Sequence, residues 1–226
     1  MKLNRQYFAI LVISFGVLTF FSQCGSEEAS STDTDSNNLV SEPVATSAST
    51  PNPAGVSPQV VSVQSEQGKE LMAIDISSGE TIIKYDQGKK VLTGESKRAD
   101  KTKYFNNQGD IIAEVKLKEG SFKLKNTEGE LLWKVKIKPE KIKISDNEEG
   151  ENPFEIKENE TGKFKVKTAD KTLGEAKFKN GKVSVKGGQT FSIPATKNSP
   201  AYAALLIKEI PEDYRLIIAA ELLKLP

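Results

Sequence analysis

Short turns that contain glycine recur along the sequence at a nearly constant spacing. These turn glycines lie 20 or 21 residues apart: Gly68, Gly88, Gly109, Gly129 and Gly150. Between the turns, apolar residues alternate with lysines, as over residues 133–138 and 164–167. Alternation with period two predicts strands that have one apolar face and one lysine-bearing face. Each repeat therefore holds two strands and a turn, so the chain is a series of β-hairpins.

The repeat predicts about twelve to thirteen short strands between residues 61 and 193. The next turn is expected at Lys171, where Asp170 keeps the turn character although the glycine is lost. About 165 residues remain once the amino-terminal segments described below are set aside, which suffices for one hydrophobic core. We therefore expect one folded domain over residues 61–226.

The last thirty or so residues break the strand pattern and predict two helices. Ser199 is a suitable N-cap with Pro200 at the first helical position, so the first helix is expected over about 199–208. Pro211 opens a second helix over about 211–225. From Leu216 to Leu223 this helix is apolar nearly all round, and only Glu221 interrupts it. A helix that is apolar on every side is normally buried.

The number of strands links these two parts of the domain. A closed sheet of about eight strands fills its interior with its own side chains, whereas one of about twelve encloses a wider lumen. The second helix would be about 22 Å long, close to the length of a six- or seven-residue strand. We therefore predict a mainly β fold: an antiparallel barrel of about twelve strands, made of repeated hairpins and filled by the hydrophobic C-terminal α-helix.

The amino terminus has the pattern of a signal peptide over residues 1–23. Lys2 and Arg5 precede an uncharged apolar run over residues 8–21. As a helix that run would rise about 21 Å, less than the roughly 30 Å of a bilayer core. The segment Phe21-Ser22-Gln23-Cys24 resembles the lipobox of bacterial lipoproteins: Ser22 fits the motif, whereas Phe21 and Gln23 depart from it.

The lipobox resemblance implies that Cys24 is acylated and becomes the new amino terminus. Two or three acyl chains would anchor the protein stably to a membrane. The alternative is an ordinary secretory peptide with an incidental cysteine. In either case the sequence predicts export, and with lipidation it predicts an extracytoplasmic protein of the bacterial cell envelope.

Residues 24–60 are rich in Ser, Thr and Pro and contain few large apolar residues. We expect a disordered tether that joins the lipid anchor to the domain and reaches on the order of 30–35 Å. The tether is acidic and has no base, whereas the domain carries a mild surplus of lysine. That surplus is too small for a nucleic-acid footprint, so no nucleic-acid partner is expected.

The hairpin repeats and the closing helix together resemble a known fold family. Residues 122–133, in which two strands flank the turn from Asn126 to Gly129, resemble a unit of the Tubby-like barrel, in particular its LURP-one-related branch. The apolar helix over residues 214–225 completes the likeness. The resemblance implies a membrane-associated role, including phosphoinositide binding as in Tubby proteins or lipid movement as in scramblases. Fold alone does not transfer a function.

The composition removes several catalytic chemistries. The chain has no histidine and its only cysteine is Cys24, so histidine-based triads, histidine-ligated zinc and disulfides cannot be built from it. No cofactor is expected. Acidic residues gather in one loop, and their oxygens could serve a glycosidase or a metal ion: Asp146, Glu148, Glu149 and Glu151. Their spacing departs from that of calcium loops, and a solvated hairpin turn is the preferred interpretation.

Two further features have both a structural and a functional interpretation. The lysine-bearing strand faces suit a solvated surface, or alternatively an anionic lipid surface. Glu221 is either a buried functional acid, or an acid that points to a barrel mouth or pairs with a lysine or Arg215.

Two functions follow from the sequence. The first is a non-enzymatic interaction or scaffold domain whose outer surface meets an envelope protein, a lipid surface or an envelope polymer. The second is a carrier of lipids or other apolar ligands, which needs an open lumen.

Overall fold

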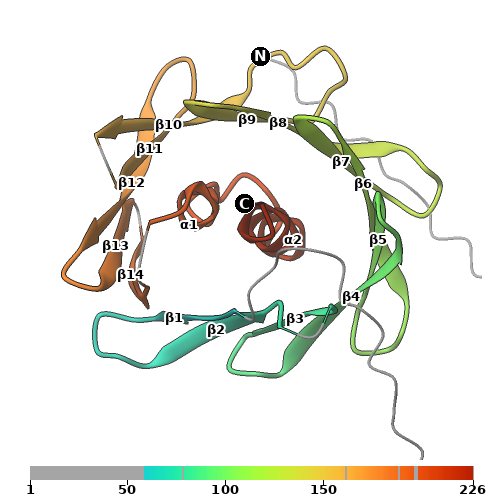
Figure 1. Cartoon of the computed structure of the whole chain (residues 1–226), viewed down its shortest axis with the longest axis horizontal. Coiled ribbons are helices and arrows are strands. Elements are labelled where there is room, and N and C mark those ends of the chain that lie inside the picture. Colours follow the sequence, from blue (N-terminus) through green and yellow to red (C-terminus); the bar gives the residue numbers. More distant parts are fainter. Residues whose placement is uncertain (1–58, 78, 161, 188, 196–197, 226) are drawn as a thin grey trace, which may run out of the picture. The chain divides into compact units, whose positions relative to one another are not determined.

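The computed structural model describes residues 59–77, 79–160, 162–187, 189–195 and 198–225. The predicted signal peptide, Cys24 and nearly all of the predicted tether lie outside the described residues. Each strand pairs antiparallel with the next along the chain, and the last pairs with the first, which closes a barrel (Figure 1). The strands are β1 (Val60–Gln64), β2 (Glu70–Asp75), β3 (Thr81–Tyr85), β4 (Lys90–Arg98), β5 (Lys101–Phe105), β6 (Ile111–Lys118), β7 (Ser121–Lys125), β8 (Leu131–Lys138), β9 (Lys141–Ser145), β10 (Phe154–Glu160), β11 (Lys163–Lys167), β12 (Thr172–Lys179), β13 (Lys182–Gly187) and β14 (Gln189–Pro194).

The structure confirms the expected barrel of antiparallel hairpins, with fourteen strands, close to the predicted number. Several of the turns share one arrangement. Asn126 Oδ1 accepts the Glu130 N–H at 2.8 Å, and Gly129 follows with a φ of +85°, a conformation that glycine adopts without strain. At the position that lacks glycine, Thr168 Oγ1 accepts the Lys171 N–H at 3.2 Å instead. Local side-chain hydrogen bonds thus close several of the hairpins, whereas the turn at Gly88 is closed by a backbone bond from the Gly88 N–H to the Tyr85 carbonyl.

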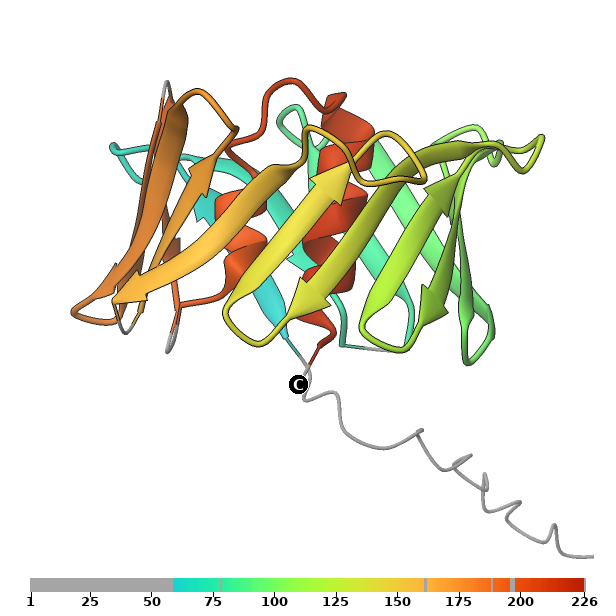
Figure 2. The ribbon, with the colours of Figure 1, turned by 90° about the horizontal axis from the view of Figure 1, so that it is seen from above.

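The apolar faces of the strands point into the barrel, as the alternation predicts. In β7, for example, Phe122 and Leu124 are buried while their neighbours are partly exposed. The interior also holds two helices, α1 (Pro200–Ala204) and α2 (Glu212–Leu223), and Figure 1 shows both inside the ring of strands. Figure 2 shows α2 running lengthwise within the wall of tilted strands. From Leu216 to Leu223, every residue of α2 is at most 9% exposed.

The first helix is shorter than predicted. It begins as expected, since Ser199 Oγ accepts the Ala201 N–H at 3.3 Å, but it ends at Ala204 rather than near residue 208. The Ile207 N–H then bonds to the Ala204 carbonyl, an i to i−3 bond of the kind that tightens a helix end. Pro211 disfavours a helical conformation for the residue before it, so the chain turns here and enters α2. The barrel filling is therefore shared between a short and a long helix.

No helix within the described residues combines the length and the hydropathy that crossing a membrane requires.

Candidate functional site

Glu221 lies inside the barrel, where it is 2% exposed. It projects from the last turn of α2. The Tyr104 hydroxyl, from β5, donates to Glu221 Oε1 at 2.5 Å, and Lys224 Nζ donates to the same oxygen at 2.7 Å. The sequence interpretation that Glu221 pairs with a lysine therefore matches the geometry. Arg215 instead points its Nη1 toward the Ile207 and Ile210 carbonyls, at 3.4 and 3.5 Å.

Tyr104 fits beside this acid because the neighbouring strand has no side chain at that point. Gly94 of β4 is paired with Tyr104, and a Cβ at Gly94 would lie 2.7 Å from Tyr104 Cε1. Burial, followed by the charge of Glu221 and the hydrogen bond to it, raises the pKa of the Tyr104 hydroxyl well above its ordinary value. The phenol is therefore held neutral as a hydrogen-bond donor. Nothing in this arrangement provides a nucleophile with an adjacent base.

A second tyrosine fixes the other end of α2. The Tyr85 hydroxyl, from β3, donates to Asp213 Oδ1 at 2.6 Å. Burial and this hydrogen bond also raise the pKa of Tyr85. Asp213 lies in the first turn of α2, where a carboxylate also complements the helix dipole. The buried polar groups thus attach α2 to the wall near both ends, which is a positioning role.

The outer wall carries two rows of four lysines that face one another directly across neighbouring strands. The first, the clamped row, runs across β5 to β8 and consists of Lys101, Lys116, Lys123 and Lys134. Like charges directly opposite one another destabilise a sheet. Two glutamates reduce this cost, because each of them bridges two of the lysines. Glu114 lies 2.6 Å from Lys101 Nζ and 3.5 Å from Lys116 Nζ.

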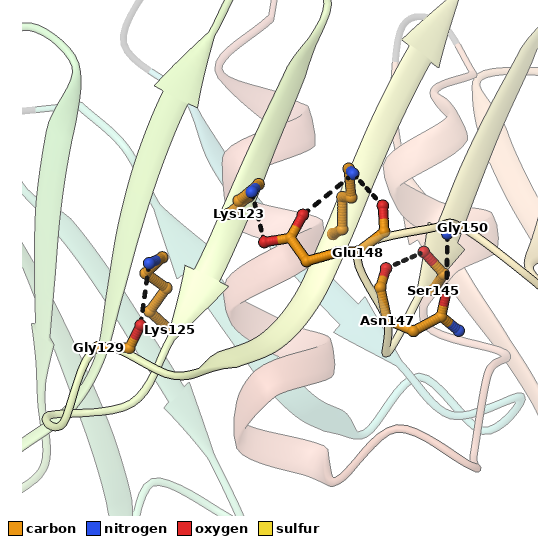
Figure 3. A network of polar contacts seen from close by, with 8 residues as sticks. Lys123, Lys125, Gly129, Ser145, Asn147, Glu148 and Gly150 are labelled. Carbon is orange, nitrogen blue, oxygen red and sulfur yellow. Dashed lines mark hydrogen bonds and ion pairs between the residues drawn. The ribbon is translucent and has the colours of Figure 1, made fainter.

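Glu148 bridges the other two lysines of the clamped row from a distant loop. Its carboxylate lies 2.5 Å from Lys123 Nζ and 3.1 Å from Lys134 Nζ, as Figure 3 shows for Lys123. Lys134 Nζ also donates to the Glu148 carbonyl oxygen. Hydrogen bonds from Lys123 and then Lys134 lower the pKa of Glu148 below its usual range. The loop between β9 and β10 is thereby held over β7 and β8.

The same loop contains the four acidic residues considered as metal ligands, and one of them, Glu148, is bound by lysines. Asn147 organises the turn, because its Oδ1 accepts the Gly150 N–H at 2.7 Å and the Glu151 N–H at 2.8 Å. Glu148 is occupied by lysines. The described residues contain no group of three or more acidic, histidine or cysteine side chains arranged to hold a metal ion. Asp146, Glu148, Glu149 and Glu151 are therefore not brought together as a ligand set.

The second set, named here the lysine row, crosses β8 to β11 and has no comparable clamp. It consists of Lys138, Lys141, Lys157 and Lys165. Only Lys141 approaches an acid, with its Nζ 4.0 Å from Glu155. Glu155 pairs more closely with Lys143, at 3.1 Å. Lys138, Lys157 and Lys165 form no side-chain hydrogen bond or ion pair with any other described residue.

Part of the lysine row lines a groove on the outer wall. The groove has a volume of about 450 Å³, and it is lined by Lys138, Pro139, Glu140, Lys141, Glu155, Lys157 and Lys167. Four lysines face two glutamates there, so the groove has a positive surplus. Lys167 also lies 3.7 Å from Glu155, which therefore serves three lysines at once. This groove, with its incompletely neutralised lysines, is the candidate binding site.

Sequence reasoning found the lysine faces but not the difference between the two rows. The alternation places lysines outward without fixing which of them oppose one another, because that depends on the register between strands. The contact of Glu148 with Lys123 joins residues 25 positions apart and depends on how the loop folds back. The repeated Lys-x-Lys pattern of neighbouring strands was the one available signal.

We predict that Tyr104→Phe lowers the free energy of unfolding by about 1–3 kcal/mol, because Glu221 loses a buried hydrogen bond. The raised pKa of Tyr104 also makes the stability of the protein depend on pH. Above about pH 10 the unfolded tyrosine gives up its proton while the folded one keeps it, so stability falls as pH rises. Denaturant unfolding at pH 7 and pH 11 should show a shallower fall for Tyr104→Phe than for Tyr214→Phe. Equal falls in the two variants would contradict this assignment.

We predict that Glu148→Gln lowers the thermal unfolding midpoint at neutral pH, since Lys123 and Lys134 then face each other without a counter-charge. The depressed pKa of Glu148 means that its contribution is complete above the ordinary carboxyl pKa and is lost as pH falls through the folded-state value. The difference from wild type should therefore vanish in acid and shrink at high salt. Glu149→Gln, in the same exposed loop, is the matched control. If it lowers the midpoint as much, the clamp is not responsible.

The chain was also compared with known proteins. No protein-family model, no curated protein sequence and no solved structure matches it.

Proposed function

We propose that the chain is a bacterial envelope lipoprotein, anchored at Cys24, whose barrel is a non-enzymatic interaction domain. Its partner meets the outer wall of the barrel rather than its interior. The observation that carries this proposal is the filling of the barrel by α1 and α2. An interaction domain needs only its surface, whereas a carrier needs space for a guest.

The burial of the interior residues supports the outer surface as the place of contact. A lumen that admits water or a lipid chain would leave accessible area on the side chains that line it. Instead, Leu216, Ile217 and Ile218 of α2 are 0% exposed, as are Val135 and Ile144 on the facing strands. The tyrosine contacts near both ends of α2 oppose displacement of the helix.

The available side-chain chemistry supports a non-enzymatic role. The chain has no histidine, and a thiol is present only at Cys24. The buried carboxylate of Glu221 is hydrogen-bonded to Tyr104 and Lys224, which leaves it no role as a free base. The outer acids Glu114, Glu148 and Glu155 are each occupied by lysines. Binding by the positively charged wall is the activity that these residues favour.

The anchor is tested by changing Cys24. In the native host, the wild-type protein should fractionate with membranes and incorporate labelled fatty acid, and Cys24→Ser should lose both properties. Ser26→Ala, which leaves the cysteine and the preceding residues in place, is the matched control and should behave as wild type. Cys24→Ser protein that stays with the membranes would contradict lipid anchoring.

The filled interior predicts that the purified full chain carries no stoichiometric free lipid. Lipids extracted from the protein would be quantified by mass spectrometry against an added standard, with the acyl chains released from Cys24 counted separately. We expect well under one molecule of non-covalent phospholipid per chain. About one molecule per chain would contradict the interaction-domain proposal and favour the carrier.

A further inference from the structure

We propose that the lysine row and its groove bind a linear anionic polymer, such as an acidic polysaccharide, laid across β8 to β11. This inference rests on the proposed function, because it names the chemical class of partner that the outer wall would meet. A polymer with a negative charge on each repeat supplies the counter-charges that the chain itself does not provide at these positions.

The two lysine rows differ in how many of their lysines have an acidic partner. Both consist of four lysines placed directly opposite one another on four successive strands. In the clamped row, Glu114 and Glu148 each bridge two lysines, so every lysine of that row has a carboxylate within 3.5 Å. In the lysine row, Lys138 faces Lys141, and Lys157 faces both Lys141 and Lys165. Glutamates thus reduce the repulsion between neighbouring lysines in the clamped row, whereas most of this repulsion remains in the lysine row.

The acids that could relieve the lysine row are turned toward other partners. Glu155 binds Lys143 at 3.1 Å, and the hydrogen bond from Lys143 lowers the pKa of Glu155, with Lys141 and Lys167 contributing less. Glu175 stands directly opposite Lys165, yet its carboxylate lies 3.4 Å from Lys163. An external anion that binds here would reduce the repulsion between these lysines, and this reduction favours binding.

The shape of the site favours a chain over a flat surface. The row crosses four strands of a closed sheet, a path of about 14 Å at the usual spacing between strands. On a barrel of fourteen strands this path follows about a fifth of the circumference, so it is convex. A planar membrane surface would touch only its middle, whereas a linear polymer can follow the curve and enter the groove beside Lys138 and Lys157.

Lysine is distributed unevenly around the barrel. Strands β8 and β9 carry lysine at alternate positions. Strands β1, β2 and β14, on the opposite side of the ring in Figure 1, contain none. Every strand from β3 to β13 carries lysine, so a polyanion is attracted to that part of the wall, which includes the lysine row, and not to β1, β2 and β14. Lysine ammonium groups suit such a partner because they act as mobile point charges that tolerate variation in the spacing of the anions.

The test measures, by calorimetry at low and high salt, how tightly an oligogalacturonate of defined length binds to the full acylated chain in neutral detergent. We expect wild-type binding that weakens with salt. Lys157→Gln/Lys165→Gln should weaken binding about tenfold, the loss expected from two exposed charge contacts. Lys69→Gln/Lys89→Gln removes the same charge from hairpin turns elsewhere and should change binding by less than about twofold. The methyl-esterified oligomer, which lacks the charges, should not bind.

Several outcomes would overturn the inference. These are absence of wild-type binding, equal weakening in the two double variants, and binding of the esterified oligomer. Lysine-row-dependent binding to vesicles containing phosphatidylglycerol, without binding to the oligomer, would replace the polymer with a lipid surface. Thermal unfolding serves as the control for misfolding. Lys157→Gln/Lys165→Gln should unfold at no lower temperature than wild type, because the repulsion between these lysines is removed. None of these results bears on the Cys24 fractionation, so failure here leaves the proposed function standing.

Discussion

The width of the closed sheet is the constraint on which the rest of this structure depends. Fourteen strands enclose more space than the inward side chains of the strands alone can fill. The apolar α2 and the short α1 occupy that space, and in turn they can be stable only where every side is covered. Sheet and helices therefore need each other, and neither would bury its apolar surface alone.

Polar contacts decide how the helix sits within this apolar environment. Apolar packing is non-directional, so it does not by itself fix the position of α2 along the barrel axis. Tyr85 and Tyr104 fix this position, because their hydroxyls donate hydrogen bonds to carboxylates near the two ends of the helix. Gly94 allows Tyr104 its place in the wall. Buried hydrogen bonds thus give specificity, while burial of apolar surface gives the stability.

A filled interior moves recognition to the outer wall, where strand register determines the electrostatics. The antiparallel pairing sets lysines directly against lysines in two rows of four. Where Glu114 and Glu148 reach them, every lysine has a carboxylate beside it. Where no acid reaches Lys157 and Lys165, positive charge remains beside a groove. The same repeated sequence pattern therefore produces a structural surface on one set of strands and a candidate binding surface on the next.

Periodicity and turn chemistry within a few residues were enough to predict the hairpin repeat, the inward and outward faces of the strands and the buried terminal helix. The same pattern identified Glu221 as an acid in apolar surroundings. Three features became visible only in the folded chain: the early end of α1 at Ala204, the partner of Glu221 and the unequal bridging of the two lysine rows by acids. Those features depend on strand register and on contacts between residues far apart in the chain, which a local pattern does not encode.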